Sequence, residues 1–560
     1  MLKWRVKPRW IRRNLHCNKR VNEMTSLEHP KANQDLTDLT LDEQKTIKEL
    51  SFFKDKQLQQ VVLSTKKLNS KDNYILGKIG VVREIFGEST THPGYLSYKL
   101  PDTKPNPYRD GLSKCTFSER QNRLSVTSLL TKSWCELRTA YDIYSQKPRF
   151  ATSRIISGAK QHSTLESTIY KIDDDWLEFN QRLNVPTFKL LEGWSDTLHR
   201  LMTLFINGEA REVLCHGYMD SSDDNGTFLS GEKIEYWQRM FDSGRTESPD
   251  TDPASKFVLV SGIIDHLVLR SKRSENLIVN QKYLEGTADV MKVIEGLQAK
   301  VSTPQAQNDW EIVVGDVKTR NVYQVPTQSS VVKASKLQVM YYRFFLDILG
   351  QAADTTYYSL LINAQKRGLD VDAPINPLNA LSLMVRHPFL IPDMNRLKHG
   401  VSINFEPFDI CNEADNKVFY DLTPYKELLT SDNSEHLREF CKKWEKPLTL
   451  RYFAARLSQF YNLMGGLLSD KLMIEYYCFG KNFHNIDFTY SHDNLCQHHA
   501  SSSKFWFGKR PIEPIKPNLK NLVTYCKYCD YSSVCLWKRE AEEACGQLGK
   551  DLQNVISEIY

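Results

Sequence analysis

The sequence lacks any run of about 18 apolar residues, so we expect no segment to span a membrane. It also lacks an internal repeat and the pattern G-x-x-x-x-G-K-[ST], which excludes the phosphate-binding loop of an ATPase. Its 12 cysteines in 560 residues are too scattered for a disulfide framework. A content of 41% hydrophobic and 25% charged residues is typical of a globular protein, and the net charge of +6 is compatible with a nucleic-acid partner without requiring one.

The first 22 residues lack acidic side chains, whereas Lys and Arg recur throughout them. Arg-rich, acid-free beginnings are typical of mitochondrial presequences. The absence of serine before Ser26 and the presence of Pro8 weaken the match, and a basic nucleic-acid tail or nuclear signal is the alternative. The segment has no apolar stretch of the kind that a secretory signal needs. We therefore expect residues 1–22 to be a presequence and the protein to reside in the mitochondrial matrix, with the nucleus as the alternative.

Local patterns predict helices first and strands later. Apolar spacing predicts a helix over 126–144 and a mainly helical region over 165–245. Dense β-branched and aliphatic residues predict strands over 257–269 and 310–318. The remaining predicted segments are a poorly ordered polar extension over 23–75 with a short helix near 41–50, helices over 288–297, 335–349 and 448–468, and an inserted loop over 395–440.

The first candidate for chemistry is Asp316-Val-Lys318, at the end of an apolar strand. Side chains two residues apart on a strand point to the same face. A carboxylate can bind Mg²⁺, and a neighbouring lysine can stabilise the charge that develops at a reacting phosphate. Other matches to this pattern, such as Asp102-Thr-Lys104, lie in polar segments. The alternative for Asp316 is an exposed ion pair at a strand end.

Asp265 strengthens this candidate, because it lies within the otherwise apolar segment 257–269. An unpaired carboxylate there would be unfavourable, and a cation shared with Asp316 would compensate for its burial. A structural salt bridge is the alternative. Gln338 and Tyr342 follow at i, i+4, where they share one helix face and can support Lys318 or a phosphate.

An upstream pair, His162 and Glu166, also has i, i+4 spacing on a predicted helix. Imidazole suits Mn²⁺ and similar ions better than Mg²⁺. A lone histidine on a helix is usually structural, so the interest of His162 comes from its place in the order of motifs.

Three cysteines near the C-terminus, Cys526-Lys-Tyr-Cys529 and Cys535, have the spacing of ligands to a metal or cluster but lack a fourth member. The group Cys496, His498 and His499 is a second candidate for metal binding. A polar surface loop is the alternative for that group.

The order His162, Asp265, Asp316-x-Lys318, Gln338-x-x-x-Tyr342 resembles the RecB-like branch of the PD-(D/E)xK nucleases. From about residue 75 to 545 the chain is similar to the exonuclease V family, whose yeast members are also called defects-in-morphology proteins. The supporting stretches are Trp134-Cys-Glu-Leu, Ser261-Gly-Ile-Ile-Asp-His, Ser335-Lys-Leu-Gln-x-Met-Tyr-Tyr, Leu361-Ile-Asn-Ala-Gln-Lys-Arg-Gly-Leu-Asp and Thr524-Tyr-Cys-x-Tyr-Cys-Asp-Tyr.

The resemblance implies an α/β fold: a PD-(D/E)xK (RecB-like) core of a mixed sheet flanked by helices, with helical insertions and a C-terminal segment tied back by an iron–sulfur cluster. The expected domain covers 76–560, with a helical part at about 126–250, the catalytic core at about 255–350 and the helical, cluster-binding part at about 351–545. It further implies the following roles: His162, Asp265 and Asp316 bind Mg²⁺ or Mn²⁺, Glu166 binds it directly or supports a ligand, Lys318 is the catalytic lysine, and Gln338 and Tyr342 position that lysine or the scissile phosphate.

The same resemblance implies that the missing fourth ligand is Cys135. Together with Cys526, Cys529 and Cys535 it would hold a [4Fe–4S] cluster. Tetrahedral zinc on the same four thiolates fits the spacing equally well. Because the nuclease motifs lie elsewhere, we expect the cluster to be structural rather than redox-active.

These expectations together describe a metal-dependent single-stranded DNA exonuclease that works from a free 5′ end, releases short oligonucleotides and acts in mitochondrial DNA maintenance. The alternatives are a non-catalytic, zinc-stabilised nucleic-acid-binding protein and an endonuclease on the same fold. We expect the protein to be a monomer that binds single-stranded DNA and does not bind a membrane. For duplex substrates we expect a single-strand-binding protein or a helicase as its protein partner.

Overall fold

The description of the fold rests on a computed structural model. The described residues are 70–100, 106, 108, 123–145, 147, 153–170, 189–229, 234–243, 256–280, 289–411 and 444–559. The predicted presequence and the short helix predicted near 41–50 lie outside them. The first described helix, α4 (Ser70–Phe86), begins ahead of Ile75, within the segment predicted to be poorly ordered.

Eight strands form two sheets in the described part of the chain, in the orders β1-β4-β3 and β2-β5-β6-β7-β8. The strands are β1 (Arg123–Ser125), β2 (Glu209–Ala210), β3 (Val213–Asp220), β4 (Phe257–Ile264), β5 (His266–Ser271), β6 (Trp310–Arg320), β7 (Leu468–Cys478) and β8 (Lys481–Thr489). The pairs β1–β4 and β6–β7 are parallel, and the other neighbours are antiparallel. This mixed α/β architecture agrees with the predicted fold class.

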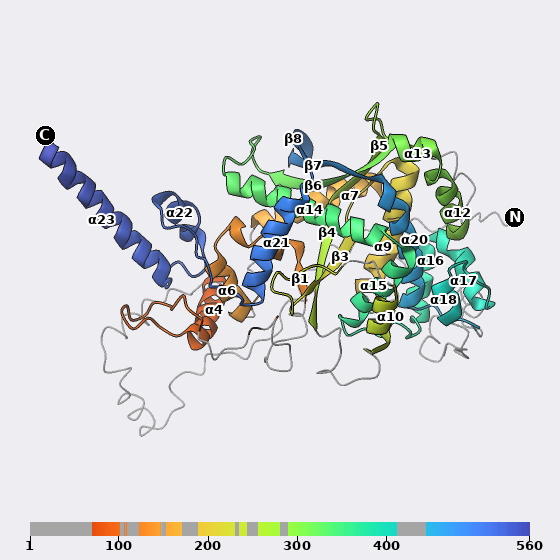
Figure 1. The fold of residues 1–560 in the computed structure, drawn as a ribbon, viewed down its shortest axis with the longest axis horizontal. Helices are drawn as coiled ribbons and strands as arrows, with labels where there is room; N and C mark the ends of the chain where they lie inside the picture. Colours follow the sequence, from red (N-terminus) through yellow and green to blue (C-terminus); the bar gives the residue numbers. More distant parts are fainter. Residues whose placement is uncertain are drawn as a thin grey trace, which may run out of the picture. The chain divides into compact units, whose positions relative to one another are not determined.

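Helices pack against both sheets, whereas the C-terminal helix α23 (Leu536–Ile559) extends away from them (Figure 1). After α4 they are α5 (Val126–Leu129), η4 (Thr131–Ser133), α6 (Glu136–Ser145), α7 (Ser153–Ile169), α9 (Lys189–Asn207), α10 (Ile234–Ser243), α12 (Val290–Val301), α13 (Pro304–Asp309), α14 (Ser329–Gly350), α15 (Ala353–Gln365), α16 (Pro377–Arg386), η6 (Pro388–Leu390), α17 (Ile391–Lys398), α18 (Glu406–Cys411), α20 (Leu450–Met464), η9 (Gly465–Leu467), α21 (His492–Trp506), α22 (Leu519–Thr524), η10 (Cys526–Tyr528) and α23 (Leu536–Ile559). Among these described helices, none has both the length and the apolar character that crossing a membrane requires.

The central helix is α14, which confirms the helix predicted over 335–349 and extends it at its N-terminal end. It lies against β3 and β4 of the smaller sheet and β6 and β7 of the larger one (Figure 1). Two glycines allow this close packing. A Cβ atom at Gly217 would lie 2.6 Å from Phe345 Cε1, and one at Gly262 would lie 2.6 Å from Tyr342 Cε1. α14 therefore brings its polar residues directly onto the sheets.

The two sheets are joined where two neighbouring strands pass from one sheet to the other. Asp265 alone separates β4 from β5, and Arg211 with Glu212 separates β2 from β3. Ile264 of β4 pairs with Val213 of β3, while β2 pairs with β5. Both chain segments therefore cross between the sheets at the same level, and this places Glu212 beside Asp265.

Three predictions of local structure were right only in part. The strand predicted over 257–269 is interrupted at Asp265 and forms β4 and β5. The described part of 165–245 is mainly helical, as predicted, but it also contains β2 and β3. The helix predicted over 126–144 is divided into α5, η4 and α6, because Leu130 and Trp134 leave the helical region with ψ of 50° and −119°. This division places Cys135 in a non-helical position, where packing overrides the helical spacing of the apolar residues.

Two other predicted helices are confirmed, with α12 covering most of 288–297 and α20 most of 448–468. The inserted loop predicted over 395–440 contains the end of α17 and α18. The part of that loop at 412–440 lies outside the described residues.

The packing of Gly262 predicts that Gly262→Ala destabilises the protein by about 1–3 kcal/mol, as overpacking in a core does. Its Cβ atom would meet Tyr342, Val126 and Cys215 at 2.6, 3.0 and 3.2 Å. Thermal melting measures the effect. The matched control is Gly80→Ala in α4, where a Cβ atom meets nothing within 4 Å. Alanine at position 80 should stabilise that helix by about 0.5–1 kcal/mol. If Gly262→Ala and Gly80→Ala shifted the melting temperature equally and in the same direction, the packing argument would be contradicted.

Candidate active site

Three side chains from different elements meet where the sheets join. His162 comes from α7, Glu212 from the β2–β3 crossing and Asp265 from the β4–β5 crossing. One nitrogen or oxygen atom of each lies within 4.8 Å of the others, and His162 Nδ1 is 3.4 Å from Glu212 Oε1. An imidazole and two carboxylates form a donor set that suits divalent cations such as Mn²⁺ and Mg²⁺.

Glu212 was not identified from the sequence. Its φ of 57° lies in the left-handed region, which a non-glycine residue occupies only where the surrounding structure enforces it. Arg200 of α9 contributes to this by donating a hydrogen bond from Nη1 to the Glu212 carbonyl at 2.7 Å. Only Val213 and Tyr218 of β3 are residue types enriched in strands, so local composition did not indicate the strand at whose entrance Glu212 lies.

Glu166 lies outside the group of three potential ligands. Its carboxylate pairs with Arg200, the same residue that holds the Glu212 carbonyl. In this arrangement Glu166 contacts the site through Arg200, so its predicted role corresponds to support of a ligand rather than to direct binding.

The second part of the site is the pair of Asp316 and Lys318 on β6. Asp316 is fully buried, and Lys318 Nζ lies 2.7 Å from its Oδ2 atom. Lys318 is thus the partner of Oδ2, whereas Asp316 Oδ1 has no hydrogen-bond partner among the described residues. Asp265 lies alongside, since its Oδ2 accepts a hydrogen bond from the backbone N–H of Val317 at 2.8 Å. One lysine therefore stands beside two carboxylates, the buried Asp316 and the half-buried Asp265. A divalent metal ion would balance the remaining negative charge and fits this donor set.

Lys318 is held in place from α14. Its Nζ donates to Gln338 Oε1 at 3.0 Å, and Gln338 Nε2 donates to Tyr342 OH at 2.8 Å. The i, i+4 pair therefore lies where the sequence placed it, next to the lysine. This relay restricts the ammonium group to one direction while its side chain remains about one-third exposed, at 31%.

The electrostatics of the site show mutual repulsion among its carboxylates. Burial and the neighbouring charge of Asp316 raise the pKa of Asp265 to about 8. Desolvation lowers the pKa of Lys318, but attraction to Asp316 and Asp265 outweighs it and raises the pKa overall. The hydrogen bond to Glu212 raises the pKa of His162 against the effect of burial. A bound cation would favour the ionised carboxylates.

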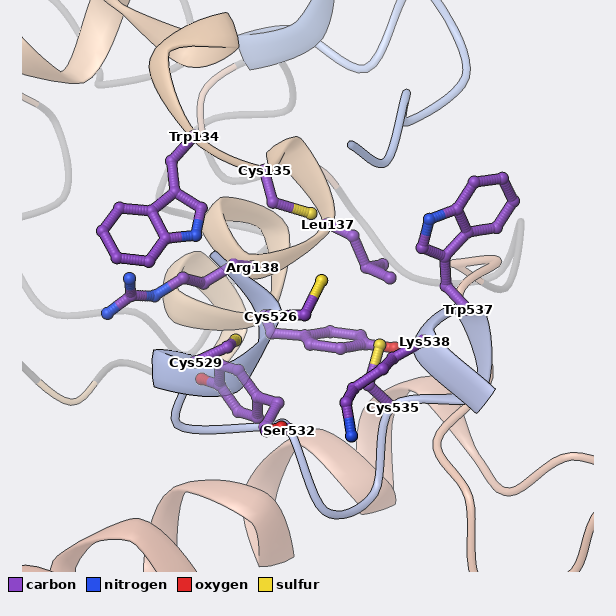
Figure 2. A pocket seen from close by; sticks show the side chains of 12 residues that line it. Trp134, Cys135, Leu137, Arg138, Cys526, Cys529, Ser532, Cys535, Trp537 and Lys538 are labelled. Carbon is purple, nitrogen blue, oxygen red and sulfur yellow. The ribbon is translucent and has the colours of Figure 1, made fainter. Parts of the chain in front are cut away.

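The four predicted cysteine ligands lie together at a second place. Cys135, Cys526, Cys529 and Cys535 line one pocket, and Figure 2 shows their sulfur atoms directed into the same space. All four are free thiols. Burial raises the pKa of Cys526 to about 11 and those of Cys529 and Cys535 to about 12. Four converging thiols fit a cluster or a zinc ion, because such a cation would stabilise their thiolates.

The second candidate for metal binding does not converge. Cys496, His498 and His499 lie on α21, a helix, and not on a surface loop. Cys496 Sγ lies 3.3 Å from His492 Nε2, and His498 Nδ1 lies 3.0 Å from Tyr341 OH. His499 Nε2 contacts a backbone carbonyl at 2.6 Å. The three side chains thus have separate partners.

The sequence matches a known protein family. The family model described as "Exonuclease V - a 5' deoxyribonuclease" matches residues 115–538. The protein named "Exonuclease V, mitochondrial" from Eremothecium gossypii is 40% identical over 500 residues, covering 86% of this chain and 90% of its own. Proteins of the same name from Vanderwaltozyma polyspora and Saccharomyces cerevisiae are 38% and 36% identical, covering 92% and 88% of this chain and 93% and 87% of their own. The chain belongs to the exonuclease V family.

Proposed function

We propose that this chain is a PD-(D/E)xK nuclease that uses a divalent metal ion to degrade single-stranded DNA from a free 5′ end in mitochondria. As an exonuclease V it is a 5′ exodeoxyribonuclease, and its relatives carry the mitochondrial name. The single-strand preference, the use of Mg²⁺, the release of short oligonucleotides and the role in mitochondrial DNA maintenance belong to the proposal. Family membership argues against a non-catalytic, zinc-stabilised binding protein.

The observation that carries the proposal is the meeting of His162, Glu212 and Asp265 within 4.8 Å, next to the buried Asp316–Lys318 pair. His162, Glu212 and Asp265 would hold the cation, and Asp316 adds a negative charge and a further oxygen ligand. When bound, the cation would lower the pKa of a water molecule and offset charge on the phosphate.

The protein groups around that cation have separate tasks. Lys318 presents a positive charge beside the carboxylates, where it can stabilise the additional charge of the transition state. Gln338 and Tyr342 hold the lysine in that direction through their hydrogen bonds of 3.0 and 2.8 Å. Arg200 keeps Glu212 at the crossing and pairs with Glu166.

We also propose that Cys135, Cys526, Cys529 and Cys535 hold a [4Fe–4S] cluster with a structural role. When bound, the cluster would link the four thiolates covalently through iron. Zinc on the same thiolates is the alternative, and iron content with absorbance near about 400 nm distinguishes the two.

The experiment that tests the proposed function is digestion of an end-labelled single strand with and without Mg²⁺. Degradation from the 5′ end that requires the metal ion supports it. Equal degradation in excess chelator would overturn the metal-dependent mechanism.

Glu212→Gln tests the ligand that the structure adds to the site. The amide keeps the shape of the side chain but loses its charge, so we expect the Mg²⁺ concentration for half-maximal rate to rise by at least about 10-fold. Asp316→Asn should abolish activity. The matched control is Glu275→Gln at an exposed site, 60% accessible, which should leave the metal requirement unchanged. An unchanged Mg²⁺ requirement in Glu212→Gln would remove Glu212 from the ligand set.

An exonuclease also requires a free end of the DNA strand. If the chain engages a 5′ end, circular single-stranded DNA and linear strands with a bulky 5′ block should resist digestion, while the unblocked linear strand is degraded. Gel analysis of the three substrates measures this. Rapid cutting of the circle would show that an endonuclease acts on the same fold.

The cysteines should behave as a unit, because thiolates bonded to one cluster contribute jointly to folding. We expect Cys135→Ala and Cys526→Ala both to lose colour and iron, to become less soluble and to lose DNA binding and cleavage. Asp316→Asn should keep its colour and still bind single strands. The control is Cys496→Ala, since this exposed thiol lies outside the cysteine pocket. Full colour in Cys135→Ala would exclude Cys135 as a ligand.

A further inference from the structure

A polar hollow lies beside the candidate active site, and its lining residues are not among the proposed metal ligands or the residues that position Lys318. Its volume is about 280 Å³, and it is lined by Ser157, Gly158 and Gln161 of α7 and by residues 319–322 at the end of β6. α7 also carries His162, and β6 carries Asp316 and Lys318. A Cβ atom at Gly158 would lie 3.2 Å from Thr319 Oγ1, so α7 and β6 approach closely at the hollow.

Polar atoms in and near this hollow lack partners. Gln161 and Arg320 line it, and the buried atoms Arg320 Nε and Gln161 Oε1 have no hydrogen-bond partner among the described residues. The same holds for the hydroxyl group of Tyr476, which is paired in register with Lys318. Buried polar groups are nearly always hydrogen-bonded, so such unpaired atoms require an explanation. A ligand that supplies both an acceptor for Arg320 and a donor for Gln161 would satisfy them.

Arg320 extends the row of charged side chains on β6. Asp316, Lys318 and Arg320 are spaced by two residues, so they point to the same face of the strand. In the described part of the chain no carboxylate forms an ion pair with Arg320. A guanidinium group in this position is suited to a phosphate, whose oxygens its planar N–H groups can match.

Aromatic side chains stand next to Arg320. Tyr323 is 61% exposed and Phe479, at the turn between β7 and β8, is 70% exposed. Their ring centroids are 6.3 Å apart, and Phe483 lies 5.6 Å from Tyr323. Phe479 has a φ of 48°, a conformation that is rare for a bulky residue. Exposed aromatic rings beside a basic group are the combination with which proteins bind single-stranded nucleic acids.

We propose that this hollow and the neighbouring aromatic pair, Tyr323 and Phe479, form a nucleotide subsite. In this subsite Arg320 binds a DNA phosphate next to the scissile bond, Gln161 accepts a hydrogen bond from an N–H group of a base, and the aromatic pair stacks against a base. The proposal rests on the proposed function. It specifies the part of the single strand that lies beside β6 and α7. The occupant is a nucleotide of the substrate, because the site combines a cation, an amide and stacking surfaces within one continuous stretch next to Lys318.

The test measures equilibrium binding of a fluorescent single strand of thymidines to the full chain in the Asp316→Asn background, over a range of salt concentrations. Arg320→Gln should lower the salt slope of the affinity by about 0.7, the value for one phosphate contact on a single strand. The control Arg273→Gln removes an arginine whose side chain is 86% exposed, and it should leave the slope unchanged. An unchanged slope in Arg320→Gln overturns the phosphate contact.

The aromatic pair is tested with strands that carry one abasic nucleotide at successive positions from the 5′ end. In the parent protein one position should lose about 5-fold to 150-fold in affinity, as expected for one stacked base. The double variant Tyr323→Ala/Phe479→Ala should lose affinity for the intact strand and no longer respond to that position. Ile410→Ala, at a 57% exposed site, is the control for removal of an exposed apolar side chain.

These outcomes separate the subsite from the proposed function. Digestion of the end-labelled strand by the wild-type protein is measured first, and its absence would overturn the proposed function itself. Digestion by the wild type, together with an abasic response that persists in the double variant, would overturn the subsite alone. If Arg320→Gln fails to fold, the exposed aromatic positions still decide the proposal, because their removal leaves the core intact.

Discussion

The active site depends on two neighbouring chain segments that leave one sheet and enter the other at the same level. Ile264 pairs with Val213 in the smaller sheet, and β2 pairs with β5 in the larger one. Asp265 and Glu212 lie between the paired strands and belong to neither sheet. Their side chains can therefore approach His162. The left-handed φ of Glu212 follows from this geometry. A break in the strands, and not their continuation, therefore creates the group of potential ligands.

The same crossing concentrates negative charge. Asp265 is bound to the backbone of Val317, and Asp316 and Lys318 flank that contact on β6. The neighbouring charge and burial raise the pKa of Asp265 to about 8, while Lys318 gains a higher pKa from the same carboxylates. The protein thus holds its carboxylates together at an energetic disadvantage that a bound cation would relieve. Carboxylates with strongly raised pKa values cluster at functional sites, which agrees with the position of this group beside Lys318.

Sequence patterns were sufficient to predict which residues lie together when those residues belong to one helix or one strand. Asp316 and Lys318 share a face of β6, and Gln338 and Tyr342 share a face of α14, as their spacings of two and four predict. Glu212 could not be found in this way, because its place depends on pairing between strands that are distant in the sequence. The strands β7 and β8 were also missed, although the parallel pairing of β6 with β7 completes the larger sheet. Long-range pairing carries the information that local periodicity lacks.

The cysteine site and the active site share one short segment, residues 123–135. Its beginning forms β1, where Ser125 pairs with Ser261 of β4, a few residues before Asp265. Its end is Cys135, and the next residue, Glu136, holds Arg510 through contacts of 2.6 and 2.7 Å. The C-terminal region is therefore attached to this segment by an ion pair as well as by the pocket of cysteines. Two separate contacts therefore connect the C-terminal region to residues 123–135. Through the pairing of β1 with β4, the same segment continues to the strand that ends beside Asp265.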